Sequence, residues 1–168
     1  GDQGAVRDVE IAYDGSSVLF AMRGPFDPNL DDEDQPTWNI WEYEIATDTL
    51  RRVIASDIVA EEGQDVAPHY LPDGRIVFSS TRQRTSKATL LDESKPQFAA
   101  LDEDRNEHAM VLHVMNDDGS DIHQVSFNQS HDLDPVVLEN GEVVFSRWDN
   151  MGNRDGIHLY KMYPDGTN

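Results

Sequence analysis

The 168-residue sequence contains no cysteine. This excludes disulfides, thiolate metal sites, a cysteine nucleophile and CxxCH haem attachment within this segment. Basic side chains are scarce, because 13 lysines and arginines stand against 33 aspartates and glutamates, for a formal charge of −20. This balance argues against nucleic acid and anionic lipid as partners, since both require a basic surface. No apolar run approaches the roughly 18 residues of a transmembrane helix, so we expect no membrane-spanning segment.

The sequence is instead rich in short alternating runs bounded by turn dipeptides. Hydrophobic residues make up 38% of the chain, which is typical of one globular domain. Runs with strand character lie at 17–22, 75–80 and 142–147. They follow the dipeptides Asp14-Gly15, Asp73-Gly74 and Asn140-Gly141. Asp-Gly and Asn-Gly supply the positive φ angles of tight hairpins, so each dipeptide predicts a strand–turn–strand unit.

A second hairpin follows in each unit and makes the pattern a repeat. These hairpins are expected at 39–54, 110–126 and from 157 to the last residue. Gly119 and Gly166 occupy corresponding turns and lie 47 residues apart. A four-stranded propeller blade has a period of roughly 40–50 residues. The repeat therefore predicts an all-β fold, namely a β-propeller segment of about three four-stranded antiparallel blades.

The predicted blades divide the whole chain, 1–168, as one partial propeller. Blade 1 covers about 8–57, blade 2 about 65–128 with an insertion at 83–107, and blade 3 about 132–168 without its last strand. Propellers typically have 4–8 blades, so three cannot close a ring. We therefore expect the rest of its own polypeptide, or other chains, to complete the propeller. A two-sheet sandwich is the alternative fold, but it would not explain the repeat.

Two stretches carry a resemblance to known families. The sequence LPDGRIVFSSTR at 71–82, followed by VMNDDGS at 114–120, resembles the TolB-type, WD40-like (PD40) propeller repeat. The stretch 138–148 with 162–168 is similar to the propeller part of exported bacterial proteins related to the hydrazine synthase alpha subunit. The resemblance implies a propeller in a periplasmic or extracellular bacterial protein. Because the CxxCH motif is missing, it transfers no catalytic residue to this chain.

The acidic residues cluster in the segments that a propeller places on one face. These long connections are 24–38, 55–67, 83–107, 128–135 and 149–155, and they hold 19 of the 33 acidic side chains. We call this the long-loop face. It predicts a non-catalytic binding or scaffold module that acts on a protein partner. The residues chosen as candidates for the partner surface are Asp27, Glu33, Arg147 and Trp148.

Calcium is a possible cofactor of the same face. The candidate ligands are Asp31, Asp32 and Asp34 in one loop and Asp102 and Asp104 in another. Calcium prefers six to eight oxygen ligands from such loops. However, the second loop lacks the glycine and the closing glutamate of an EF-hand, and a solvated acidic surface explains the same residues. Both interpretations stay open.

No catalytic constellation is visible in this segment. There is no G-x-S-x-G elbow, no H-E-x-x-H zinc motif and no glycine-rich phosphate loop. Asp65 and Asp132 begin two of the units and are expected to cap turns. The alternative function is the propeller portion of a multi-domain enzyme. That enzyme would be a hydrazine-synthase-like haem protein or a propeller-gated peptidase, with its catalytic residues outside this segment.

Overall fold

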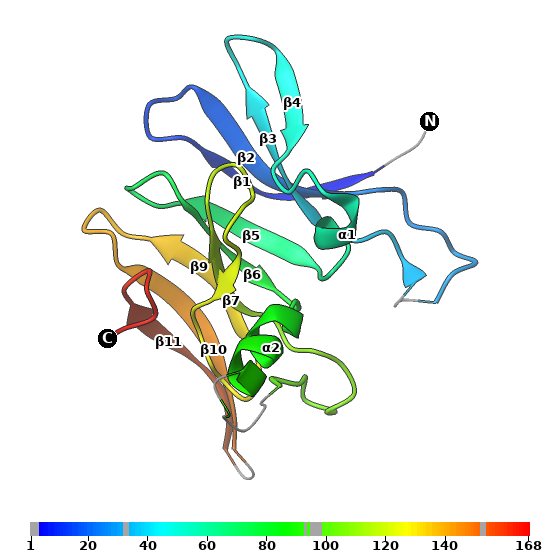
Figure 1. Cartoon of the computed structure of the whole chain (residues 1–168), viewed down its shortest axis with the longest axis vertical. Helices are drawn as coiled ribbons and strands as arrows, with labels where there is room; N and C mark the ends of the chain where they lie inside the picture. The colour runs from blue at the N-terminus through cyan, green and yellow to red at the C-terminus, as the bar shows by residue number, and fades with distance from the viewer. Residues whose placement is uncertain (1–3, 32–33, 93, 95–98, 152–153) are drawn as a thin grey trace.

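Three separate antiparallel sheets, stacked side by side, make up the computed structural model (Figure 1). It describes residues 4–31, 34–92, 94, 99–151 and 154–168. Sheet 1 contains β1 (Ala5–Ile11), β2 (Ser17–Arg23), β3 (Asn39–Glu44) and β4 (Thr49–Arg52). Sheet 2 contains β5 (Asp65–Tyr70), β6 (Ile76–Ser80), β7 (Val111–Met115) and β8 (His123–Gln124). Sheet 3 contains β9 (Asp132–Val137), β10 (Val143–Met151) and β11 (Arg154–Met162).

Each sheet is a meander in which consecutive strands pair, so the three sheets are repeats of one unit. This confirms the all-β class and differs from the two-sheet sandwich. The tight turns of Gly15, Gly74 and Gly141 lie at one end of the strands, and the long connections lie at the other (Figure 1). All three glycines have positive φ, as the dipeptides predicted.

The first strand of every sheet carries a β-bulge at the same place. Asp8, Ala67 and Asp134 have φ values of 54°, 49° and 49°, and the strand register shifts beside each of them. A left-handed backbone in three non-glycine residues is unusual, so its threefold recurrence marks a repeated structural feature. The bulge defines equivalent positions in the three sheets.

Apolar side chains fill the two spaces between the sheets. Between sheets 1 and 2, Leu19 and Ile40 pack with Ile76 and Phe78. Between sheets 2 and 3, a second cluster is built from Leu71, Val77, Leu112, Val114, Val125, Val143, Phe145 and Met162. Burial of these side chains removes apolar surface from water and holds neighbouring sheets face to face. The core therefore lies between the sheets and leaves one face of sheet 1 and one face of sheet 3 outside it.

Helices are short and lie only in the long connections. The helix α1 (Asp57–Ala60) joins sheets 1 and 2, and Ser56 caps its first turn. The helix α2 (Arg84–Asp92) belongs to the 83–107 insertion. Gln83 is buried and closes this insertion, because its amide bonds the backbone of both Ala100 and Ala109. No helix in the described part of the chain is long and apolar enough to cross a membrane.

The turn at Gly119 gives a first testable prediction. Gly119 has a φ of +78°, and a Cβ there would lie 2.4 Å from the carbonyl oxygen of Val53. Gly15 has a φ of +73° with nothing within 4 Å of its Cβ position. Gly15→Ala should therefore cost only the left-handed strain, about 1 kcal/mol. Gly119→Ala should cost roughly 1–3 kcal/mol more, because the methyl group overpacks the contact between sheets.

Urea unfolding followed by tryptophan fluorescence would measure both free energies of unfolding. Equal losses for Gly15→Ala and Gly119→Ala would contradict the close approach of the turn to Val53.

Candidate functional site

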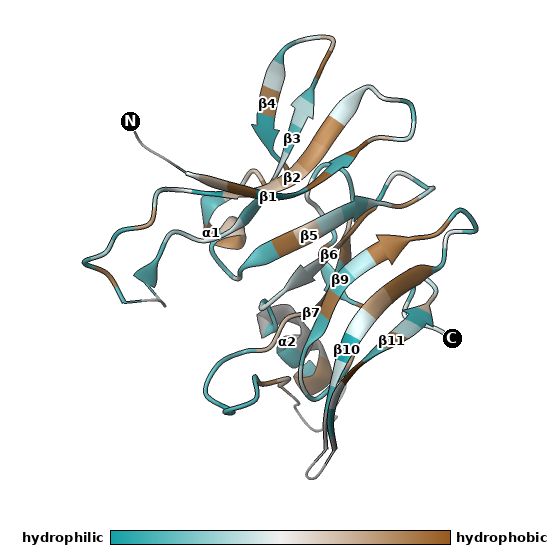
Figure 2. Cartoon of the chain, turned by 180° about the vertical axis from the view of Figure 1, so that it is seen from behind, coloured by the Kyte–Doolittle hydropathy of each residue, from teal (hydrophilic) through white to brown (hydrophobic). Residues whose placement is uncertain are grey.

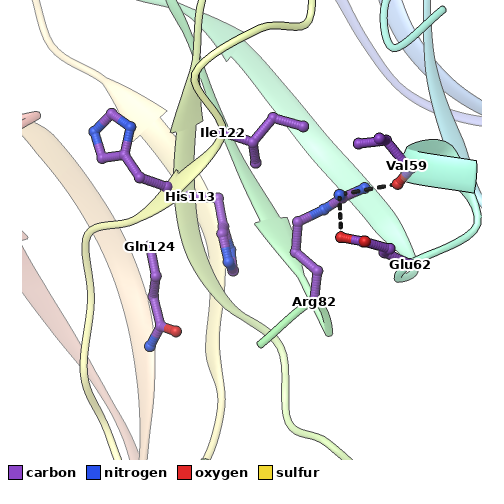
Figure 3. A pocket seen from close by; sticks show the side chains of 7 residues that line it. Val59, Glu62, Arg82, His113, Ile122 and Gln124 are labelled. Carbon is purple, nitrogen blue, oxygen red and sulfur yellow. Dashed lines mark hydrogen bonds and ion pairs between the residues drawn. The ribbon is translucent and has the colours of Figure 1, made fainter. Parts of the chain in front are cut away.

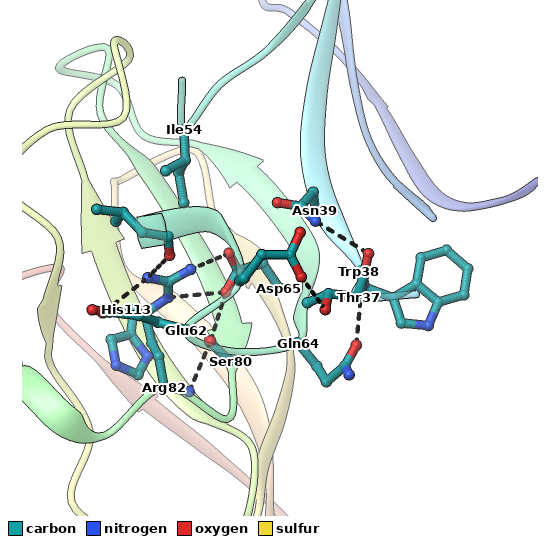
Figure 4. A network of polar contacts seen from close by, with 12 residues as sticks. Thr37, Trp38, Asn39, Ile54, Glu62, Gln64, Asp65, Ser80, Arg82 and His113 are labelled. Carbon is teal, nitrogen blue, oxygen red and sulfur yellow. Dashed lines mark hydrogen bonds and ion pairs between the residues drawn. The ribbon is translucent and has the colours of Figure 1, made fainter. Parts of the chain in front are cut away.

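A buried ion pair lies where β5 and β6 reach the long-loop face (Figure 4). Asp65 is fully buried, and its Oδ1 accepts hydrogen bonds from the Ser80 hydroxyl at 2.6 Å and from Arg82 Nε at 3.0 Å. Its Oδ2 pairs with Arg82 Nη2, which makes the contact bidentate. Burial raises the pKa of the Asp65 carboxyl, and Arg82 opposes this rise. Arg82 Nη1 also donates to the carbonyl oxygen of Val59 in α1.

Sheet 3 has a second pair at the equivalent aspartate. Asp132 is fully buried and accepts two hydrogen bonds from Arg147, at 2.7 and 2.9 Å. The Arg147 guanidinium also lies over the ring of Tyr160, 4.8 Å from its centroid. The bond to Asp132 raises the pKa of Arg147. Asp65 and Asp132 thus hold arginine side chains, of which Arg82 is buried and Arg147 half-buried, and the expectation that they cap turns was wrong.

Sheet 1 has no charge at the corresponding position. In register, Asp65 lies opposite Ser80 and Asp132 lies opposite Arg147. The equivalent pair in sheet 1 is apolar, since Val6 lies opposite Met22. In sheets 2 and 3, the side of the sheet that carries the aspartate–arginine pair packs against the sheet before it in the chain. Sheet 1, which has no such pair, packs against no described sheet on that side. In both pairs the carboxylate of the buried aspartate is used to neutralise an arginine.

A small enclosed space of about 50 Å³ borders the Asp65–Arg82 pair (Figure 3). Val59, Glu62, Arg82, His113 and Gln124 are among the side chains around it. His113 is buried, and its Nδ1 lies 3.0 Å from the carbonyl oxygen of Val111. Burial lowers the pKa of His113 to about 4, so its ring is neutral at neutral pH. The space has room for one or a few water molecules and is too small for an organic substrate.

A larger cleft, of about 610 Å³, lies between sheet 1 and the 24–37 segment. Gln35 is buried and keeps this segment folded, because its side-chain amide donates to the carbonyl oxygens of Asp27 and Leu30 and accepts from the Asp27 amide. The lining combines apolar side chains with carboxylates; it includes Met22, Trp41, Leu30, Pro36, Asp34 and Glu61. The cleft can hold part of a partner next to the acidic loops.

The predicted site residues do not converge on one point among the described residues. Asp27 Oδ1 accepts from the backbone and side-chain amides of Asn29, and these bonds lower the pKa of Asp27. Asp102 Oδ1 accepts from the Asn106 and Glu107 amides. Both carboxylates thus close their own loops. Asp31, Asp34 and Asp104 are exposed.

The calcium prediction gains no support from the described residues. None of their histidine, aspartate and glutamate side chains form a group of three or more that could hold a metal ion. Asp32 and Glu33 lie outside the described residues. Calcium at Asp31, Asp32, Asp34, Asp102 and Asp104 therefore stays a prediction.

The two remaining surface candidates are tied into sheet 3. Arg147 is held by Asp132, as described above. Trp148 is half-buried; its backbone amide donates to the His131 carbonyl oxygen, and its own carbonyl accepts from Asn128. The indole nitrogen of Trp148 is buried and has no hydrogen-bond partner among the described residues. A role for either residue at a partner surface stays a prediction.

Comparison with known proteins identifies the fold. No family model and no curated protein matches the sequence. Among solved structures, the chain is similar to hydrazine synthase from Kuenenia stuttgartiensis, with a TM-score of 0.66 and 17% identity over 96% of this chain and 24% of that one. It is also similar to a putative TolB from Agrobacterium tumefaciens, with a TM-score of 0.55 and 18% identity over 97% of this chain and 63% of that one. At this identity the likeness concerns the fold alone. Together with the three repeated sheets, it shows that the chain is an all-β segment of a β-propeller.

Proposed function

We propose that this segment is a non-catalytic binding and scaffold module of a larger exported bacterial protein, and that it acts through its acidic long-loop face. One observation carries the proposal: three arginines that lie next to the long connections are neutralised within the chain. Arg82 pairs with Asp65, Arg147 with Asp132, and Arg52 with Asp57. The chain keeps a formal net charge of −20, and exposed loop carboxylates such as Asp31 and Asp34 contribute to it.

The chemistry of this surface favours a basic protein as the partner. Clustered carboxylates attract cationic surfaces and raise the rate of encounter, and salt screens this attraction. The cleft beside Trp41 adds an apolar surface next to Asp34 and Glu61, which would fit a lysine or arginine side chain with its aliphatic stem. A periplasmic or extracellular location belongs to the same proposal, because it rests on the repeat resemblance.

Binding of a lysine-rich peptide would test the long-loop face. The variant Asp31→Asn/Asp34→Asn removes two exposed carboxylates from this face. The control Asp117→Asn/Glu139→Gln removes two from the tight-turn end, so the net charge of the two variants is equal. We expect the first variant to weaken peptide binding about threefold or more at low salt and the control to change it less. Calorimetry at two salt concentrations would measure both, and equal losses would contradict a localised binding face.

A second candidate function is supported by the likeness to hydrazine synthase over 96% of this chain. In this alternative the segment is the propeller portion of a multi-domain enzyme, either a haem protein of that kind or a propeller-gated peptidase. The catalytic residues would lie outside the segment, and the buried aspartate–arginine pairs would only stiffen the propeller. Haem absorption or peptidase activity in the full-length protein would favour this alternative over the scaffold.

A further inference from the structure

Arg23, the last residue of β2, differs from the arginines described above because no described carboxylate neutralises it. Its side chain is half-buried, and its Nε is buried without a hydrogen-bond partner among the described residues. Leu19, which alternates with Arg23 along the strand, is 0% exposed and belongs to the core between sheets 1 and 2. Arg23 therefore lies on the side of sheet 1 that faces sheet 2, and further blades packed against the other side would not cover it.

The ring of Trp38 fixes the position of Arg23. The guanidinium carbon lies over this ring, 4.9 Å from its centroid. The Trp38 backbone is tied to sheet 2, because its N–H donates to Gln64 Oε1 and its carbonyl accepts from the Asp65 N–H, both at 2.9 Å. Figure 4 shows the indole directed away from the buried Asp65–Arg82 pair. A guanidinium that uses its face for an aromatic ring keeps its in-plane N–H donors for an acceptor such as a carboxylate.

Arg23 lines the cleft of about 610 Å³ between sheet 1 and the 24–37 segment. Ligand sites in proteins have volumes of roughly 300–1,000 Å³. Figure 2 shows the segment as a mainly hydrophilic loop that extends outward from sheet 1. Its two ends meet, because a Cβ on Gly24 would lie 3.3 Å from the Cβ of Pro36. The chain itself thus builds this cleft at the long-loop face.

A second unpartnered polar group lines the same cleft. Asn39 is the first residue of β3 and is only 7% exposed. Its Nδ2 donates to the carbonyl oxygen of Thr37 at 3.1 Å, and its Oδ1 is turned away from that carbonyl (Figure 4). The Oδ1 has no hydrogen-bond partner among the described residues. Since an unpartnered buried acceptor is destabilising, a ligand N–H placed here is favoured.

Two carboxylates border the cleft as well. Asp34 and Glu61 line it, and neither forms an ion pair with Arg23. The Thr37 hydroxyl donates to Glu61 Oε2 at 2.7 Å and so positions this carboxylate, whereas Asp34 is exposed. The cleft therefore offers a cation, a carbonyl acceptor and two carboxylates next to apolar side chains. A ligand that matches it carries one carboxylate, one N–H donor and one cationic group.

We propose that this cleft binds the C-terminal residue of a basic protein, and that this residue is lysine or arginine. Arg23 would hold the terminal carboxylate, Asn39 would accept the backbone N–H, and the two carboxylates would face the cationic side chain. A C-terminal lysine or arginine carries all three groups on one residue, whereas an internal lysine has no carboxylate. The inference rests on the proposed function, in which the partner is a basic protein, and it names the part of that partner that is recognised.

Titration of the full chain with short peptides, followed by NMR, would test the inference. The reference ligand is acetyl-alanyl-lysine with a free carboxylate. Its C-terminal amide lacks the charge for Arg23 and should bind about tenfold or more weakly. Acetyl-alanyl-norleucine lacks the cation for Asp34 and Glu61 and should bind about threefold or more weakly. Acetyl-glutamyl-lysine amide offers its carboxylate on a side chain instead, and binding equal to the reference would overturn a C-terminal site.

Arg23→Gln separates this site from the general attraction of the acidic face. The variant should bind the free acid and the amide equally, because the terminal carboxylate has lost its cation. Arg75→Gln is the matched control: it removes the same charge from the exposed pair with Asp73 and should keep the wild-type preference for the free acid. An Arg23→Gln variant that keeps this preference would assign the carboxylate to another residue and overturn the inference. Circular dichroism of each variant confirms that the sheets are folded.

The peptide comparison on the wild-type chain stands whether or not a variant folds. If the wild type binds the free acid and the amide equally, or does not bind the reference peptide at millimolar concentration, the inference is wrong. The proposed function would still stand in either case if Asp31→Asn/Asp34→Asn weakens binding of the lysine-rich peptide more than its control does.

Discussion

Asp65→Ala is expected to lower the free energy of unfolding by about 3–5 kcal/mol, because it leaves Arg82 charged and buried without its carboxylate. Asp65 accepts hydrogen bonds from both Ser80 and Arg82, and its side chain is inaccessible to solvent. Loss of the carboxylate also leaves the Ser80 hydroxyl without this acceptor. Urea unfolding at pH 7, followed by fluorescence and by circular dichroism, measures the effect.

Two further variants make this prediction specific to burial. Asp73→Ala removes a similar carboxylate from the exposed pair with Arg75 and should cost less than about 1 kcal/mol. The double variant Asp65→Leu/Arg82→Met removes both charges and should regain most of the stability lost by Asp65→Ala. If Asp65→Ala and Asp73→Ala had similar costs, the pair would not be the buried contact seen between α1 and sheet 2.

The stability of the protein should fall by about 3 kcal/mol between pH 6.5 and pH 4 through His113 alone. Burial, reinforced by the nearby positive charge of Arg82, lowers the pKa of His113 to about 4. An unfolded histidine has a pKa of about 6.5. Above pH 6.5 neither state is protonated, so His113 adds no pH dependence. Below pH 6.5 the unfolded chain takes up a proton that the folded chain does not, and unfolding becomes easier until the folded ring also protonates near pH 4.

Unfolding free energies measured at several pH values would isolate this effect by comparison with His113→Leu. The variant should lose the slope between pH 6.5 and 4, whatever its stability at pH 8. Burial raises the pKa of Asp65 and acts in the opposite direction, so the difference between variant and wild type is the quantity to compare. Ile58→Leu, at an exposed position of α1, changes no titrating group; it is the control and should keep the wild-type slope. A His113→Leu slope equal to wild type would contradict a buried, neutral ring.

The turn dipeptides and their spacing were sufficient to predict the sheets. Asp-Gly and Asn-Gly dipeptides act locally, because glycine adopts the positive φ of a tight turn without a steric cost. Gly15, Gly74 and Gly141 have that geometry, and the strands on both sides pair as expected. The 47-residue period then gave three equivalent sheets, which the likeness to solved propeller structures supports.

The buried charges and the bulges were not predicted, because they depend on contacts between distant segments. Asp65 and Asp132 both begin the sequence pattern D-x-x-P, but their partners stand at different offsets: Arg82 lies beyond its strand and Arg147 lies inside one. A local pattern could not show that each arginine pairs with the aspartate at the equivalent position of its own sheet. For the same reason the sequence did not show that Asp132 holds the guanidinium of Arg147, whose role at a partner surface stays a prediction.

The sequence by itself determined the strand-turn-strand repeat, the absence of thiol chemistry and the strong negative charge, since each follows from residue type and spacing alone. Only the tertiary structure decided which equivalent residues are covered. Leu112 and Leu159 have the same place in their sheets, and one is buried while the other is open to solvent. The reason is physical: burial and ion pairing depend on which sheet packs against a given face, and that neighbour comes from elsewhere in the chain or from another molecule.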